Sequence, residues 1–135
     1  MIDLSQLNFH HIGVACKDLD AETAKLKIMG YAIEGDDFID PIQGVKGRFL
    51  AGQTPRLELL VPLAGDSVLA PWLTSNVKMY HLAYETDSLA DTIGQLCAQR
   101  GRLVVKPVPA VAFDHREIAF IMLPNMLLIE LISTA

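Results

Sequence analysis

The hydrophobic and polar positions of this chain follow a strand, helix, strands order that occurs twice. The first copy opens with the alternating run Phe9–Ala15, and the second opens with Met79–Glu85. Period-two alternation is typical of a β-strand that buries one face. Because His11 and His81 stand at corresponding places in these runs, 70 positions apart, the chain contains an internal repeat.

A helix is predicted after each opening strand. Asp18 is a helix-capping residue type that precedes residues 19–29, and Gly30 ends this segment. Ser88 begins a capping box, and the segment that follows it closes at Gly101. Both helices are expected to pack one apolar face on a sheet.

Three shorter apolar runs follow each helix, and the last of them are residues 56–61 and 126–132. The sequence therefore predicts an α+β protein of two βαβββ modules, at residues 8–63 and 78–133, with a linker at 64–77. Each module has a single helix on one face of a small sheet, so the two modules are expected to complete one core together.

Strand alternation also places polar side chains on one face of the predicted sheet. The residues that share this face are His11, Glu58, His81 and Glu130. In each of their strands the opposite face is apolar, as a helix-covered face must be. Small neighbours such as Gly13 and Ala83 leave open space, which indicates the concave side of a curved, cup-shaped sheet.

Two imidazoles and two carboxylates on a partly buried surface would be costly to bury without a neutralising partner. A divalent cation supplies that neutralisation, and mixed nitrogen and oxygen donors suit Zn, Ni, Co, Mn or Fe. The alternative is that each of these residues is an ordinary core histidine or an exposed strand glutamate. Gln43 and Arg48 are candidates for substrate binding because both could reach into the cup.

Composition narrows the classes of partner. The net charge is -5 and the 11 Lys and Arg residues are spread along the chain, which argues against a nucleic-acid partner. The most apolar stretch, 118–132, is interrupted by Pro124 and falls short of the roughly 20 residues of a membrane span. The first residues lack a secretory signal, which predicts a cytoplasmic protein with Cys16 and Cys97 as reduced, buried thiols.

Four short runs carry a resemblance to a known family: His11–Ala15, Pro41–Val45, the stretch Leu57–Leu63 with Asp66 and Ser67 after it, and Leu128–Leu131. With these runs the chain resembles the vicinal oxygen chelate superfamily, the glyoxalase and bleomycin-resistance group, and within it most resembles the methylmalonyl-CoA epimerases.

The resemblance covers nearly the whole chain and implies a single glyoxalase-like domain over residues 1–135 that surrounds one divalent metal ion. It places His11, His81 and Glu130 on the family's metal ligands and Glu58 on the fourth ligand position. It also implies a homodimer, a state that such folds commonly adopt.

The implied activity is that of a metal-dependent isomerase or lyase. Such an enzyme stabilises the enolate of a small oxygen-rich substrate, a thioester or hemithioacetal, and Glu130 would carry the proton. Ile42 departs from the pattern, because similar epimerases have a catalytic glutamate immediately before the Gln-Gly-Val tripeptide, and Asp40 is the nearest carboxylate.

Two other functions remain open. A non-catalytic protein that binds a small molecule or antibiotic on the same fold is the main alternative. An iron dioxygenase that uses His11, His81 and Glu130 as its triad is the third, and Glu58 as a further ligand counts against it.

Overall fold

The computed structural model of the chain describes residues 3–65 and 67–134. The described residues form two compact units. One unit is His11–Tyr80, and the other combines the described residues up to His10 with those from His81 onward.

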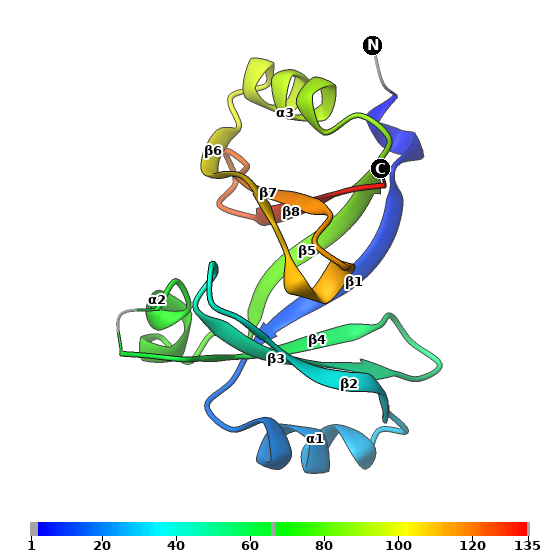
Figure 1. The fold of residues 1–135 in the computed structure, drawn as a ribbon, viewed down its shortest axis with the longest axis vertical. Coiled ribbons are helices and arrows are strands. Elements are labelled where there is room, and N and C mark those ends of the chain that lie inside the picture. The colour runs from blue at the N-terminus through cyan, green and yellow to red at the C-terminus, as the bar shows by residue number, and fades with distance from the viewer. Residues whose placement is uncertain (1–2, 66, 135) are drawn as a thin grey trace. The chain divides into compact units, whose positions relative to one another are not determined.

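The His11–Tyr80 unit contains a sheet of strand order β2-β3-β4-β1, with β1 parallel to β4 and the other neighbours antiparallel. Helix α1 lies along one face of this sheet (Figure 1). The elements are β1 (Asn8–Ala15), α1 (Leu19–Lys27), β2 (Ala32–Asp40), β3 (Val45–Ala51), β4 (Leu57–Pro62) and α2 (Ala70–Thr74).

The second unit contains the strand order β5-β8-β7-β6, with β5 parallel to β8 and the others antiparallel. Its elements are a 3-10 turn at Leu4–Gln6, β5 (Met79–Thr86), α3 (Leu89–Ala98), β6 (Arg102–Pro109), a 3-10 turn at Val111–Phe113, β7 (Glu117–Met122) and β8 (Leu128–Ser133). The predicted α+β fold of two βαβββ modules is therefore confirmed, and the module bounds stay predictions.

Helices α1 and α3 begin at the residues that the sequence predicts as their caps. The Asp18 carboxylate accepts a hydrogen bond from the Ala21 amide at 2.8 Å, and the Ser88 hydroxyl accepts one from the Asp91 amide at 3.4 Å. The caps satisfy amide groups that have no partner inside the helix.

The helix ends differ in part from the prediction. Gly30 ends α1 in the left-handed conformation (φ +90°), where a glycine costs least. Helix α3 ends instead with Arg100 in that conformation (φ 70°), and the Gly101 amide then donates to the Leu96 carbonyl at 2.8 Å. The predicted linker also contains a short helix, α2, which the prediction missed because Pro71 and the small residues around it read as a connection.

The cores lie under the helices. Below α1, Cys16, Leu19, Leu50 and Leu59 form a buried cluster. Below α3, the corresponding cluster is Ile121, Ile129 and Leu131, with side chains of α3 packed against it. The apolar faces predicted from strand alternation thus pack under the helices in both units, while Glu58 and Glu130 take the opposite parity in β4 and β8.

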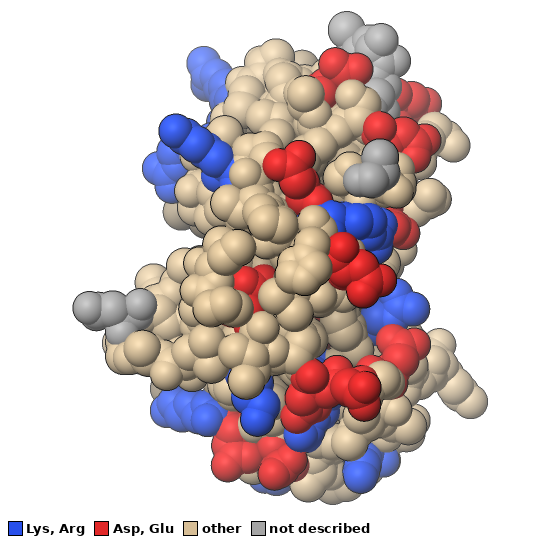
Figure 2. Space-filling model, viewed as in Figure 1, with Lys and Arg blue, Asp and Glu red and all other residues tan. Residues whose placement is uncertain are grey.

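Asp66, which belongs to one of the motif runs, lies outside the described residues. None of the described helices is long and apolar enough to cross a membrane. On the face of the molecule in Figure 2, basic and acidic side chains are interspersed.

The two cysteines have different environments. Both are free thiols, but Cys16 is buried whereas Cys97 is exposed, so the prediction that both are buried is wrong for Cys97. The residue lies near the end of α3, beside the helix face that packs on the sheet rather than within it. Burial raises the pKa of the Cys16 thiol to about 11.

We expect a chromogenic disulfide reagent at pH 8 to modify Cys97 rapidly and Cys16 only when the protein unfolds. The thiolate is the reactive form, and at this pH Cys16 is both protonated and out of contact with solvent. The absorbance of the released chromophore, followed over time with and without denaturant, gives the rates at which Cys97 and Cys16 are modified. Rapid labelling of folded Cys97→Ser protein would contradict the expected burial of Cys16.

Candidate functional site

In the His11–Tyr80 unit, a histidine and a glutamate meet on the sheet face opposite α1. Parallel pairing of β1 with β4 sets Gly13 beside Glu58, and His11 has the same parity as Gly13. The His11 Nε2 atom lies 3.1 Å from Glu58 Oε1. Both residues are buried, with exposed fractions of 0% and 4%.

An aromatic ring on the neighbouring strand completes this arrangement. Phe49 of β3 stands opposite Glu58 in the antiparallel register. Its ring meets the His11 imidazole edge to face, with centroids 5.5 Å apart and planes at 80°. This contact restricts the orientation of the imidazole that faces Glu58.

The second unit repeats the arrangement on equivalent strands. Ala83 of β5 pairs with Glu130 of β8, and His81 shares the parity of Ala83. The His81 Nε2 atom lies 3.1 Å from Glu130 Oε1, and the two residues are 1% and 2% exposed. Phe120 of β7 stands opposite Glu130, and its ring meets His81 edge to face with centroids 5.1 Å apart.

Each unit therefore holds one buried His–Glu pair with a phenylalanine ring against the histidine. The sequence analysis identified the histidines and glutamates but missed Phe49 and Phe120. A signal for them exists, because each phenylalanine precedes its glutamate by a similar offset, nine positions in one copy and ten in the other.

The donor atoms of each pair fit a divalent metal ion. The nitrogen and oxygen of each His–Glu pair lie 3.1 Å apart, close enough for both to contact one ion at the roughly 2.0–2.2 Å that such ligands adopt. Imidazole nitrogen and carboxylate oxygen are ligands that first-row transition metals accept. His11, Glu58, His81 and Glu130 are all buried and all offer such atoms.

Two residues singled out from the sequence lie at the end of β2: Asp40 is its last residue, and Gln43 is in the turn that follows. The buried Asp40 carboxylate accepts hydrogen bonds from the backbone amides of Ile42 and Gln43, both at 3.1 Å. It also accepts one from the Gln43 side-chain amide at 2.8 Å. Asp40 thereby shapes the turn and holds Gln43, while Ile42 is 59% exposed.

Arg48, the other predicted substrate-binding residue, lies on the α1 side of its sheet. It stands opposite Leu59, which belongs to the core under α1, and so faces away from His11 and Glu58. Its guanidinium donates to both Asp37 carboxylate oxygens, at 2.7 and 2.8 Å. Its Nη1 also donates to Asp20 at 2.9 Å.

These contacts have an electrostatic consequence. The hydrogen bond from Arg48 lowers the pKa of the Asp37 carboxyl, and desolvation opposes this shift only in part. Since a protonated carboxyl would lose the ion pair, the stabilisation is present at neutral pH and is lost as the pH falls. The arrangement links α1 to β2 and β3, and a role of Arg48 in substrate binding stays a prediction.

The repeated βαβββ order and the paired His and Glu residues define a class of protein. The model of the Glyoxalase/Bleomycin resistance protein/Dioxygenase superfamily matches residues 10–120. The chain belongs to this superfamily.

Methylmalonyl-CoA epimerases are among the proteins most similar to it. An ethylmalonyl-CoA/methylmalonyl-CoA epimerase from Cereibacter sphaeroides is 25% identical over 114 residues, which are 83% of this chain and 85% of that protein. The crystal structure of methylmalonyl-CoA epimerase from Mycobacterium tuberculosis is 27% identical, with a TM-score of 0.80 over 100% of this chain and 93% of that one.

A further epimerase structure holds a ligand. It is a single-residue variant of the Streptomyces coelicolor methylmalonyl-CoA epimerase in complex with 2-nitronate-propionyl-CoA, and it is 25% identical with a TM-score of 0.77 over 96% of each chain. These likenesses indicate an epimerase-like or other glyoxalase-superfamily function, and they confirm the fold class.

Proposed function

We propose that this protein is a metal-dependent enzyme that removes and returns a proton at the carbon next to a thioester carbonyl, with a 2-carboxyacyl-CoA as its substrate. The observation that carries the proposal is the repeated buried His–Glu pair, 3.1 Å between Nε2 and Oε1 in each unit. Similarity to epimerases that act on CoA thioesters supports the choice of substrate class.

One divalent ion, of Zn, Ni, Co, Mn or Fe, is proposed to bind both pairs. Its ligands would be His11, Glu58, His81 and Glu130. When bound, such an ion polarises substrate oxygens as a Lewis acid and lowers the cost of negative charge that develops on them. Two neutral imidazoles and two carboxylates make a formally neutral site with a 2+ ion, which removes most of the cost of burying the carboxylates.

Glu130 is proposed as the residue that carries the proton. Its carboxylate takes the proton from the substrate carbon, and the electron pair of the broken C–H bond moves toward the thioester carbonyl to give an enolate. The protonated carboxyl exchanges its proton with solvent and then delivers a solvent-derived proton to that carbon. Burial beside Phe120 and His81 lowers the local dielectric, which strengthens the electrostatic interactions of the carboxylate.

Inversion of configuration requires a second acid or base on the opposite face of the enolate. Ile42 occupies the position where similar epimerases carry that glutamate, and Asp40 is held by three hydrogen bonds from its own turn. We therefore expect this protein to exchange the substrate proton with solvent faster than it inverts the configuration of the carbon.

The test measures metal content and exchange together. Protein purified without chelator is expected to contain about one transition metal ion per chain by elemental analysis. Incubation with methylmalonyl-CoA in deuterium oxide should then place deuterium at carbon 2, as followed by mass spectrometry. Exchange should stop on removal of the metal and return on its restoration. A protein that binds no transition metal and exchanges no proton would contradict the proposal.

The second candidate is a protein that binds a small molecule without turning it over. The exposed aliphatic side chain of Ile42, at a position of catalytic importance in similar epimerases, favours it. This candidate is distinguished by ligand binding that survives metal removal, together with absence of exchange in the metal-loaded protein.

A further inference from the structure

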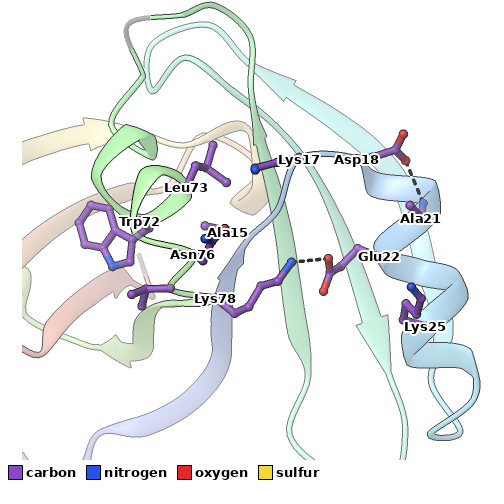
Figure 3. A pocket seen from close by; sticks show the side chains of 11 residues that line it. Ala15, Lys17, Asp18, Ala21, Glu22, Lys25, Trp72, Leu73, Asn76 and Lys78 are labelled. Atoms are coloured by element: carbon purple, nitrogen blue, oxygen red, sulfur yellow. Dashed lines mark hydrogen bonds and ion pairs between the residues drawn. The ribbon is translucent and has the colours of Figure 1, made fainter.

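A pocket of about 260 Å³ opens in the His11–Tyr80 unit, away from the His11–Glu58 pair. Figure 3 shows α1 on one side of it and α2, with Trp72, on the other. Lysines from three separate segments line it: Lys17 after β1, Lys25 on α1 and Lys78 just before β5. Lys17 and Lys25 are neighbours at α1, whereas Lys78 lies 53 positions after Lys25 and is brought to them by the fold.

Two of the three ammonium groups have no opposing charge bound to them. Lys78 donates to Glu22 at 2.7 Å. Among residues 3–65 and 67–134, Lys17 and Lys25 form no ion pair, and the Asp18 carboxylate beside them accepts the capping hydrogen bond of α1. The lining therefore has three lysines against two carboxylates, Asp18 and Glu22, and this local excess of positive charge in a chain of net charge -5 favours an anion.

The opposite wall of the pocket is aromatic and apolar. Trp72 is half-buried, and its ring meets Tyr80 edge to face with centroids 4.7 Å apart, which restricts its orientation. Leu73 lines the pocket next to it. Aromatic side chains bind planar rings by stacking, and lysines bind phosphate as point charges.

We propose that this pocket binds the phosphate groups of a nucleotide, with Lys17 and Lys25 on the phosphates and Trp72 beside the base. Two sources have this chemistry, the nucleotide end of a CoA thioester and a free nucleotide. The first source rests on the proposed function. One CoA thioester could reach both the pocket and the proposed site, because Ala15 lines the pocket and lies four residues along β1, about 13 Å, from His11.

Trp72 makes binding directly observable, because it is the only tryptophan of the chain. Titration of the intact protein with adenosine 3',5'-bisphosphate is expected to change its tryptophan emission in a saturable way, and added salt should weaken the binding. This measurement involves neither the metal nor proton exchange. Failure of the proposed enzymatic function therefore leaves its outcome unaffected.

Matched variants test whether the nucleotide binds in this pocket. Lys25→Ala and Lys17→Ala are each expected to weaken binding about tenfold, the size of one lost contact between charged groups. Lys27→Ala removes the same charge from the same helix outside the pocket and should leave the affinity within about twofold. No saturable change at millimolar nucleotide, or equal effects of the Lys25 and Lys27 substitutions, would overturn the proposal.

A comparison of ligands distinguishes the two sources. If the pocket binds the nucleotide end of the substrate, CoA gives the same change in emission, and Lys25→Ala raises KM for methylmalonyl-CoA but not for its pantetheine analogue. If the ligand is a free nucleotide, the bisphosphate binds while CoA does not, and KM for the thioester stays unchanged. Both results support nucleotide binding by the pocket.

Discussion

Replacement of Glu130 with glutamine is expected to lower the rate of solvent deuterium exchange into methylmalonyl-CoA by at least about a hundredfold. Glutamine preserves the shape of the buried side chain, but its amide cannot accept a proton from carbon. Loss of the carboxylate also removes one anionic donor from the proposed metal site. The measurement is deuterium incorporation by mass spectrometry, with metal content determined on the same sample.

Two further variants test whether the loss of exchange is specific to the Glu130 carboxylate. Glu117→Gln, at an exposed position of β7 in the same unit, should exchange at the rate of the unchanged protein. Glu58→Gln should retain more exchange than Glu130→Gln, because Glu58 is proposed to bind the metal without carrying the proton. Full exchange by folded, metal-loaded Glu130→Gln protein would remove Glu130 from the mechanism.

Gly101→Ala is expected to destabilise the protein by about 2–3 kcal/mol, since overpacking at a closely packed position has costs of this size. A Cβ atom at residue 101 would lie 2.7 Å from the Leu96 carbonyl oxygen and 3.0 Å from a methyl group of Ile121. Because the nearer atom belongs to the backbone, a side-chain rotation cannot relieve the contact. Urea unfolding followed by circular dichroism measures the loss.

Gly94→Ala provides the matched control, inside the helix that ends just before Gly101. Gly94 lies inside α3, and a Cβ atom there meets nothing within 4 Å. Alanine favours the helix over glycine by about 0.8–1 kcal/mol, so this variant should be more stable than the unchanged protein. A Gly101→Ala protein as stable as the Gly94→Ala protein would show that the end of α3 adapts freely.

Much of the fold could be predicted from local patterns. Asp18 and Ser88 are caps because their side chains accept hydrogen bonds from amides two or three residues ahead, an interaction that depends only on neighbouring residues. Strand alternation placed Glu58 and Glu130 opposite to Leu59 and Leu131 for the same reason. These are short-range properties of the chain.

Other features depended on contacts between distant residues. Arg48 lies in a strand between Gly47 and Phe49, and its partners, Asp20 and Asp37, come from α1 and β2. The exposure of Cys97 likewise depended on how α3 is rotated on its sheet. Periodicity alone does not fix that rotation to within one residue.

By itself, the sequence determined the order of the elements, the internal repeat and the identity of the His and Glu residues, because each follows from spacing along one segment. The tertiary structure decided that each histidine lies 3.1 Å from its glutamate, with Phe49 or Phe120 against the imidazole. It also brought Lys17, Lys25 and Lys78 to one pocket. Such contacts are set by strand register and helix docking, which depend on the packing of many residues at once.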